Sequence, residues 1–266
     1  MREERKYFAG KHPRIELNGE FSSMASEANH LNGICAVVTG AGKGIGRATA
    51  LALASAGANV FAVARTEDDL LALEKECSCL PGKLTPFVAS VSDEEKIHFL
   101  FEGIRKWVER LDLLVNCAGI ASFGPTEEFT VEEWRRTIET NLTGAFICAR
   151  EAIRLMKPAG GGLIVNVASI AGKRGFSNSA AYCASKAGMV GLSQALREEL
   201  RGTGVKVTAL CPGAVDTAIW ESVPNRPEGV RMMKPEDIAA AIVGLALQPA
   251  SVVTEELVLM PPEGVL

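Results

Sequence analysis

The sequence predicts a single α/β domain, a doubly wound parallel sheet of about seven strands with helices on both faces. From Ile34 onwards, short apolar runs rich in β-branched residues alternate with stretches of helical periodicity. The runs are apolar along their whole length, as strands are in a parallel sheet that is covered on both faces. A chain of 266 residues is long enough to bury one large core. We therefore expect one domain over residues 32–266.

The expected elements follow one another along the chain. The strands are Ile34–Thr39, Asn59–Ala64, Leu84–Val88, Leu113–Asn116, Gly162–Val167, Lys206–Leu210 and Glu256–Leu259. The helices begin near Ile45, Glu67, Asp93, Val131, Ala180 and Pro235, and two of them are long, Val131–Met156 and Ala180–Arg201. Because a doubly wound sheet binds its ligand beyond the carboxyl ends of the strands, we expect the functional residues there.

The first 31 residues differ from the rest of the chain. They are polar and without periodicity, and they contain no apolar segment of the kind a secretory signal needs. We expect a polar arm that is flexible or draped over the surface. The alternative is an arm that reaches a neighbouring subunit.

Composition excludes several classes of function. A formal net charge of −4 makes a nucleic-acid partner improbable, and the longest apolar runs are far too short to cross a membrane. The seven cysteines are scattered, without a Cys-x-x-Cys pair or a histidine at metal-ligand spacing. We therefore expect reduced thiols in a cytoplasmic protein, and no metal site. None of the three histidines lies beside a motif, which argues against histidine acid–base chemistry.

A glycine-rich turn separates the first strand from the first helix. It reads Thr39-Gly40-Ala41-Gly42-Lys43-Gly44-Ile45-Gly46. Glycines let such a turn adopt positive φ and let the backbone approach a pyrophosphate, while the N-terminus of the next helix favours anions. Its position between a buried strand and a helix predicts a phosphate-binding turn rather than a mere tight turn.

The residues at the end of the second strand indicate which dinucleotide such a turn would bind. An NAD enzyme of this architecture usually ends that strand with an acidic residue that binds the ribose 2′-hydroxyl. Here the strand ends at Ala64 and Arg65 follows, while Lys43 adds a second cation from the glycine turn. A guanidinium can bind a 2′-phosphate through two hydrogen bonds. We therefore predict NADP(H), the alternative being that both cations are solvated surface charges.

Five motifs in register, from about Ile34 to Ala218, resemble the short-chain dehydrogenase/reductase family, whose domain is of the Rossmann type. They are the T-G-x-x-x-G-x-G turn, Asn116-Cys117-Ala118-Gly119, Asn141 in Asn141-Leu142-Thr143-Gly144, Ser169 with Tyr182-x-x-x-Lys186, and Pro212-Gly213 with Thr217. The resemblance implies cofactor binding by Gly40, Lys43, Gly44, Ile45, Gly46, Arg65, Ser90, Val91, Asn116, Ala118, Gly119, Tyr182, Lys186, Pro212, Gly213, Val215 and Thr217.

Two departures from the family pattern stand out. Ser90 occupies the position where the family usually has an aspartate beside the adenine, and a serine can still hydrogen-bond the adenine amino group. The chain also lacks the Gly-rich segment that many members carry after the last strand, and it ends Met260-Pro261-Pro262-Glu263-Gly264 before its last two residues. The second departure leaves the subfamily and the subunit contacts of the tail open.

The catalytic residues are expected to be Asn141, Ser169, Tyr182 and Lys186. Tyr182 and Lys186 are four residues apart and so share one face of a helix, where the ammonium would lower the tyrosine pKa. Ser169 would hydrogen-bond the substrate oxygen from the end of a strand. The resemblance implies that Tyr182 is the general acid or base, that Lys186 also holds the nicotinamide ribose, and that Asn141 positions a water molecule.

The sequence thus predicts an NADP(H)-dependent oxidoreductase that interconverts a carbonyl, of the ketone or 3-oxoacyl type, and a secondary alcohol. The alternatives are a cofactor-sensing protein without turnover and a sugar-nucleotide epimerase or dehydratase. The loop over residues 215–234 is the expected substrate lid, and Ile219, Trp220 and Val223 make it apolar, either for a hydrophobic substrate or for packing. The two long helices imply, by resemblance, a homodimer or homotetramer.

Overall fold

The computed structural model describes residues 30–108, 110–222 and 232–264. The polar arm expected over residues 1–31 therefore lies almost wholly outside the described part, as does the middle of the expected lid, residues 223–231. Seven parallel strands form one sheet in the order β3-β2-β1-β4-β5-β6-β7. The strands are β1 (Cys35–Thr39), β2 (Asn59–Ala64), β3 (Lys83–Val88), β4 (Leu113–Asn116), β5 (Gly162–Val167), β6 (Val205–Pro212) and β7 (Glu256–Leu259). This is the doubly wound sheet that the sequence predicts.

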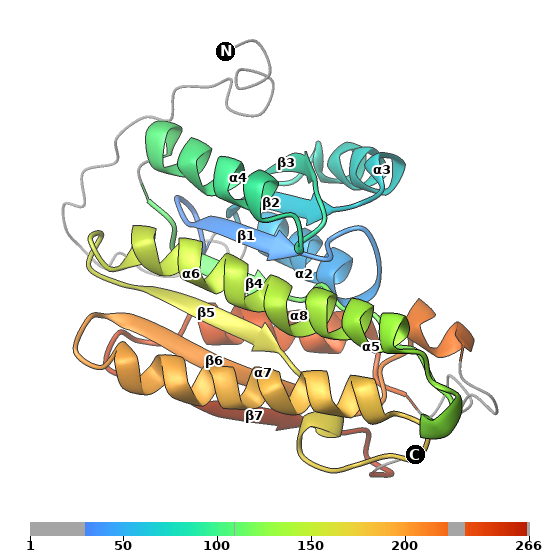
Figure 1. Cartoon of the computed structure of the whole chain (residues 1–266). Coiled ribbons are helices and arrows are strands. Elements are labelled where there is room, and N and C mark those ends of the chain that lie inside the picture. Colours follow the sequence, from blue (N-terminus) through green and yellow to red (C-terminus); the bar gives the residue numbers. More distant parts are fainter. Residues whose placement is uncertain (1–29, 109, 223–231, 265–266) are drawn as a thin grey trace.

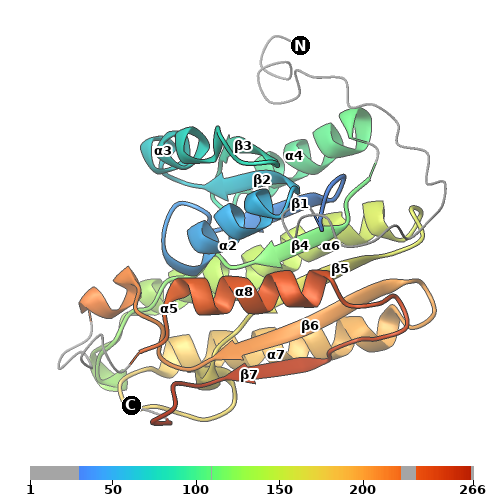
Figure 2. The ribbon, with the colours of Figure 1, turned by 180° about the vertical axis from the view of Figure 1, so that it is seen from behind.

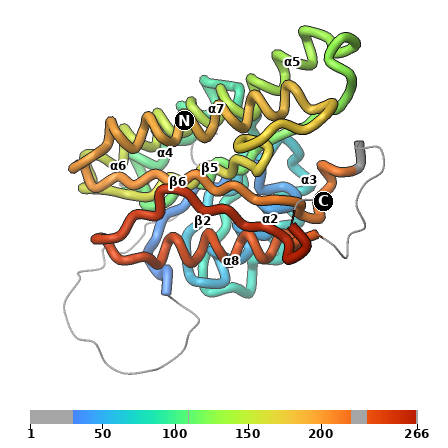
Figure 3. The backbone as a smooth tube through the Cα atoms, turned by 90° about the horizontal axis from the view of Figure 1, so that it is seen from below, coloured from blue at the N-terminus to red at the C-terminus, as the bar shows by residue number. Residues whose placement is uncertain are grey.

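Helices cover both faces of this sheet. They are α2 (Gly44–Ser55), α3 (Glu67–Cys77), α4 (Glu94–Trp107), α5 (Val131–Ile138), α6 (Gly144–Met156), α7 (Ala180–Glu199) and α8 (Pro235–Ala246). Figure 1 shows α4, α6 and α7 on the near face, and Figure 2 shows α2, α3 and α8 on the opposite face. Seen along the layers, the sheet lies between the two groups (Figure 3).

Every strand except the edge strand β7 contributes side chains to two cores. On β1, Val37 packs with residues of α4, α6 and α7, whereas its neighbours Ala36 and Val38 pack with residues of α2, α3 and α8. All three are fully buried. Alternate side chains of a strand point to opposite faces, so a sheet covered on both sides requires uninterrupted apolar strands. The apolar runs in the sequence therefore coincide closely with the observed strands. The largest difference is at β6, which extends two residues beyond its expected end.

The helix starts agree with the sequence to within one residue. At α4, for example, the carboxylate of Asp93 accepts a hydrogen bond of 3.1 Å from the backbone N–H of Lys96 and so caps the helix. No helix in the described part of the chain is long and apolar enough to span a membrane.

The predicted long helix over residues 131–156 is wrong in one respect. A π-helical segment, Glu139–Thr143, separates α5 from α6. Asn141 is fully buried in this segment, and its side chain bonds to the loop that follows β4. Such insertions occur frequently at functional sites. The α7 helix likewise ends at Glu199, two residues before its expected end.

The order of the strands locates the expected binding crevice. The chain runs from β1 to β2 and β3 on one side of the sheet, and from β4 to β7 on the other. The point of reversal lies between β1 and β4, and a ligand is expected beyond the carboxyl ends of these strands.

Candidate active site

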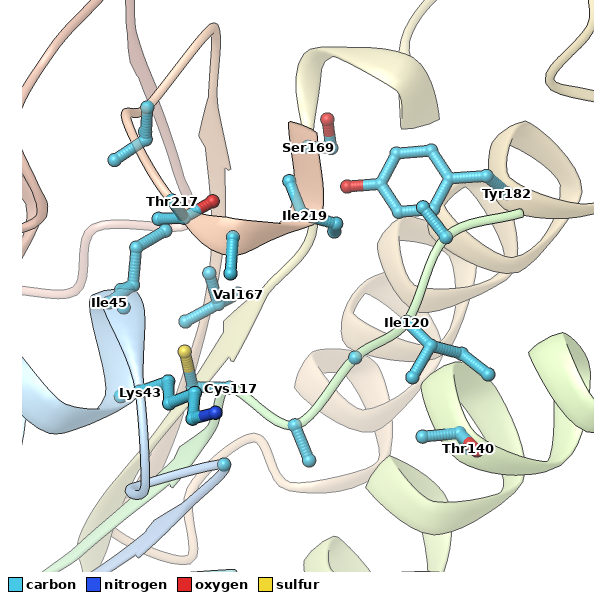
Figure 4. A pocket seen from close by; sticks show the side chains of 18 of the residues that line it. Lys43, Ile45, Cys117, Ile120, Thr140, Val167, Ser169, Tyr182, Thr217 and Ile219 are labelled. Carbon is cyan, nitrogen blue, oxygen red and sulfur yellow. The ribbon is translucent and has the colours of Figure 1, made fainter. Parts of the chain in front are cut away.

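A cavity of about 930 Å³ opens at the carboxyl ends of the strands. Its walls come from the segments that follow β1, β2, β3, β4, β5 and β6 and from the first turns of α2, α3 and α7. Figure 4 shows Lys43 and Ile45 on one side of the cavity and Ser169 and Tyr182 on the other.

The glycine turn is packed directly against the end of β4. A Cβ atom on Gly40, whose φ is +68°, would lie 2.8 Å from the Cα of Ala118, and a Cβ on Gly46 would lie 2.3 Å from the carbonyl oxygen of Gly40. The Thr39 hydroxyl accepts hydrogen bonds from the N–H groups of Cys117, at 3.0 Å, and Ala118, at 3.1 Å. Side chains are thus excluded from the turn, and its backbone is held at the cavity wall.

The N-terminus of α2 faces the cavity and carries no acidic residue of its own. The cap residue, Lys43, makes no side-chain capping bond, and the first turn of the helix contains no acidic residue. Gly44, Ile45 and Gly46 line the cavity. The free N–H groups and the helix dipole at this end therefore favour a bound phosphate.

Both predicted cations lie at the rim near this turn. Arg65 is exposed and lines the cavity directly after β2. Lys43 also lines it, with its Nζ atom 3.8 Å from the Oδ2 atom of Asp69. Sequence analysis missed Asp69, which lines the cavity from the first turn of α3. In the sequence, only its position four residues after Arg65 indicates that Asp69 lies near the cavity.

Most of the other predicted cofactor-binding residues line the same cavity. This set is Ser90, Val91, Ala118, Gly119, Pro212, Gly213, Val215 and Thr217. Although the chain lacks the family's Gly-rich segment after the last strand, Gly213 is still held in place there. Its N–H donates a 2.7 Å hydrogen bond to the carbonyl of Leu259 at the end of β7.

Asn116, which was predicted to bind the cofactor, is not among the residues that line the cavity. Its side chain is buried, and its Nδ2 atom donates to Asn166 Oδ1 at 2.9 Å and to the Ala145 carbonyl at 3.2 Å. Asn166 donates in turn to the hydroxyl of Ser193 on α7. Asn116 therefore ties β4 and β5 to α6.

Asn141 also lies behind the cavity wall. Its Oδ1 atom accepts from the N–H of Ile120, and its Nδ2 atom donates to the Ile120 carbonyl and to the Ser185 hydroxyl. Both Nδ2 hydrogens are thereby used, so the side chain can offer a water molecule only the second lone pair of Oδ1. Its neighbours Thr140 and Ile120 form the cavity wall.

Ser169, Tyr182 and Lys186 meet inside the cavity. Ser169 follows β5 and accepts a 3.1 Å hydrogen bond from the N–H of Ala171, while Tyr182 and Lys186 come from the first two turns of α7. Lys186 is buried, and its Nζ atom donates to the Val167 carbonyl at 2.8 Å. The three residues that the sequence motif groups together therefore line one cavity in the structure.

Burial dominates the ionisation of this cluster. It raises the pKa of Tyr182 to about 12, against the smaller opposing effect of a hydrogen bond with Ser169. It also lowers the pKa of Lys186 to about 8. The expectation that the tyrosine pKa would be lowered is thus wrong, because burial raises it.

Beyond the tyrosine, the cavity is lined by side chains that sequence analysis did not identify. The Phe123 ring lies 6.3 Å from that of Tyr182, centre to centre. Ile120, Phe176, Ser177, Asn178 and Ser179 line this end as well. Ile219 and Trp220 of the expected lid join them, and the Trp220 indole donates to the Val215 carbonyl at 2.9 Å. Val223, Pro224, Pro227 and Gly229 lie outside the described residues.

Comparison with known proteins agrees with this arrangement. The family model described as short chain dehydrogenase matches residues 34–228. The 3-oxoacyl-[acyl-carrier-protein] reductase FabG of Thermotoga maritima is 35% identical over 237 residues, covering 86% of this chain and 96% of that protein. Sepiapterin reductase of Chlorobaculum tepidum is 36% identical over 235 residues, with coverage of 86% and 96%.

A solved structure extends the likeness to three dimensions. It is a metagenomic short-chain oxidoreductase in complex with NADP, 34% identical, with a TM-score of 0.78 and coverage of 88% of this chain and 99% of that one. With the sheet order, the glycine turn and the Ser169–Tyr182–Lys186 cluster, these matches identify the chain as a member of the short-chain dehydrogenase/reductase family of oxidoreductases.

Proposed function

We propose that residues 32–266 form an NADP(H)-dependent catalytic domain that interconverts a ketone and a secondary alcohol. One observation carries the proposal: Ser169, Tyr182 and Lys186 converge in the same cavity as the glycine turn and the N-terminus of α2. A reducible carbonyl beside the tyrosine would thus share one enclosed space with a dinucleotide.

The residues of the cavity fit such a dinucleotide. A side chain on Gly40 or Gly46 would collide with backbone, so the turn leaves a surface that only a close-lying group such as a pyrophosphate would cover. Lys43 and Arg65 at the rim suit a 2′-phosphate. The similar metagenomic oxidoreductase was solved with NADP, which supports the same cofactor here. When bound, the nicotinamide supplies or accepts the hydride.

The protein's own groups would handle the proton. At neutral pH Tyr182, with a pKa of about 12, keeps its proton and can donate it to the substrate oxygen. Ser169 can donate a hydrogen bond to that oxygen as negative charge develops on it. Lys186, with a pKa of about 8, is mostly charged at neutral pH and can stabilise the tyrosinate that the proton transfer leaves.

Asn141 serves this chemistry by positioning. It clamps both backbone groups of Ile120, which lines the cavity, and it bonds to Ser185, one residue before Lys186. The Ser185 hydroxyl donates in turn to the Tyr182 carbonyl at 2.7 Å. The asparagine thereby links the loop after β4 to the helical turn that carries both catalytic side chains.

The lining next to Tyr182 supports an uncharged substrate. Among the described residues at this end, Ile120, Phe123, Phe176 and Trp220 are apolar, and the polar ones are neutral serines and an asparagine. Of the charged lining residues, Lys43, Arg65 and Asp69 surround the glycine turn, whereas Lys186 lies near Tyr182, where its Nζ atom donates to the Val167 carbonyl. Enclosing an unpaired substrate carboxylate beside these apolar side chains would cost free energy. A neutral ketone or 3-oxoacyl ester therefore fits this end better than a keto acid.

A matched pair of substrates tests this proposal. Ethyl acetoacetate and acetoacetate share one 3-oxoacyl skeleton and differ in charge. We expect NADPH oxidation with the ester and a kcat/KM at least about a hundredfold lower with the acid. Faster turnover of the acid would refute the substrate class. Tight NADPH binding without turnover of any carbonyl would refute the enzyme and favour a cofactor sensor.

We further propose that the protein assembles as a homodimer or homotetramer. Val131 and Trp134 on α5 are 62% and 41% exposed, and Phe146 on α6 is 45% exposed. All three lie on helices of the near face of Figure 1, where apolar exposure would be reduced by a second copy. Light scattering during gel filtration measures the mass of the assembly, and a monomer would contradict this proposal.

A further inference from the structure

The cofactor end of the cavity contains an acidic side chain as well as two cations. Asp69 lines the cavity together with Lys43 and Arg65. Its Oδ2 atom lies 3.8 Å from the Lys43 Nζ atom, and the aspartate side chain is 28% exposed. A Cβ atom on Gly42 would lie 3.2 Å from the Asp69 Cβ atom and 3.4 Å from its Oδ2 atom. The carboxylate is therefore held against the glycine turn.

We propose that Asp69 limits how strongly the site prefers NADPH over NADH, because it competes with a 2′-phosphate for Lys43. This inference rests on the cofactor proposed above. A 2′-phosphate that pairs with Lys43 must approach the carboxylate that the same lysine already contacts, and like charges repel. NADH carries a hydroxyl in place of that phosphate and escapes the repulsion. Its ribose can even donate a hydrogen bond to a carboxylate, as in NAD sites whose acid ends the second strand.

A purely structural role for Asp69 must be separated from this one. Glu67, Asp68 and Asp69 all lie in the first turn of α3, where acids stabilise a helix through its dipole. Asp68 is exposed and is not among the residues that line the cavity. Asp68→Asn is therefore a matched control, since it removes one acid from the same turn without touching the rim.

The test compares two nucleotides that differ only at the 2′ position. Isothermal titration of the full chain with adenosine 2′,5′-bisphosphate and with AMP needs no turnover and no substrate. We expect Asp69→Asn to bind the bisphosphate about fivefold more tightly than the wild type at low salt, because it removes one charge that lies 3.8 Å from the lysine proposed to bind the 2′-phosphate. Binding of AMP should stay unchanged, and the gain should shrink as added salt screens the charges. Asp68→Asn should alter neither affinity.

Steady-state kinetics gives a second readout. The KM for NADPH should fall in Asp69→Asn, because Asp69 lines the cofactor end of the cavity beside Lys43 and would oppose the 2′-phosphate. The KM for NADH should not fall.

Three results would overturn the inference. The first is that the wild type prefers the bisphosphate over AMP, yet Asp69→Asn binds the bisphosphate with the same affinity as the wild type. The second is an equal gain for both nucleotides, which would assign the effect to the 5′-phosphate. The third is an equal gain in Asp68→Asn. A wild-type protein that does not prefer the bisphosphate over AMP would instead refute the proposed NADP(H) site, and this inference with it.

Discussion

The Nζ atom of Lys186 lies 5.8 Å from the centre of the Tyr182 ring. Burial raises the pKa of Tyr182 and lowers that of Lys186, and so favours the neutral form of each group. Lys186 donates to the Val167 carbonyl, and Tyr182 shares a hydrogen bond with Ser169. At rest the two are therefore a neutral phenol beside an ammonium that gives up its proton readily. The first two predictions concern that lysine.

Carbonyl reduction should slow as the pH rises through about 8. There Lys186 loses its proton in the folded protein, and a neutral amine stabilises the tyrosinate less well than an ammonium does. The measurement is kcat/KM for ethyl acetoacetate across the neutral to alkaline range, which reports the ionisation of the free enzyme. A value that stays level well above pH 8 would show that the charge on Lys186 is not used.

Lys186→Met should be more stable than the wild type at neutral pH, by about 3 kcal/mol less the contribution of the lost bond to the Val167 carbonyl, although inactive. The folded-state pKa of about 8 lies below the unfolded value, so burying the charged lysine costs free energy at pH 7. Between about pH 8 and the unfolded pKa of about 10.4, the unfolded chain binds more protons at this residue than the folded one. The contribution of Lys186 to the free energy of unfolding therefore rises with pH in that window, and the gap between the two proteins should narrow.

Urea unfolding of both proteins at pH 7 and near pH 10 checks this directly. Other groups that titrate in this range are common to the two proteins, so the difference isolates the lysine. A gap that does not change with pH, or a wild type that is the more stable at pH 7, would contradict the assigned burial cost.

Replacing either rim cation should weaken NADPH selectively. Arg65→Ala and Lys43→Ala each remove a charge-assisted contact to the proposed 2′-phosphate, which predicts a loss of about tenfold in affinity for NADPH and little change for NADH. Fluorescence titration of the reduced cofactors measures both constants. Arg65→Lys serves as a control that keeps the charge. An equal loss for the two cofactors would mean that these residues bind a part common to both.

Asn141→Ala should lower both stability and kcat. The substitution leaves the N–H and carbonyl groups of Ile120 without their partner and removes one bond to Ser185, at a cost of about 2–3 kcal/mol. Ser185→Ala loses the bond to Asn141 but leaves the Ile120 clamp intact, so it should cost less. If the two variants lost stability equally, the Ile120 bonds would not be the ones that matter.

The fold could be predicted from the sequence because its signals are local. An apolar run predicts a strand covered on both faces, and Asp93 predicts the start of α4, whatever the rest of the chain does. The glycine turn and the Tyr182–Lys186 spacing likewise depend on neighbours along the chain. Those parts of the prediction agree with the structure.

The rest depends on partners far away in the sequence. The Nδ2 atoms of Asn116 and Asn141 donate to Asn166 and Ser185, and the Asn141 Oδ1 atom accepts from Ile120, each partner at least 21 residues distant. The π-helical segment accompanies the burial of Asn141. The sign of the Tyr182 pKa shift follows from burial, which no spacing rule contains.

The most direct test of the whole account is NADPH oxidation with ethyl acetoacetate by the wild type and by Tyr182→Phe, with NADPH binding measured on both. Phenylalanine keeps the ring beside Phe123 and removes only the hydroxyl. We predict that the variant binds NADPH as the wild type does and loses at least about a hundredfold in kcat. Equal turnover by the two proteins would contradict the assignment of Tyr182 as the proton donor.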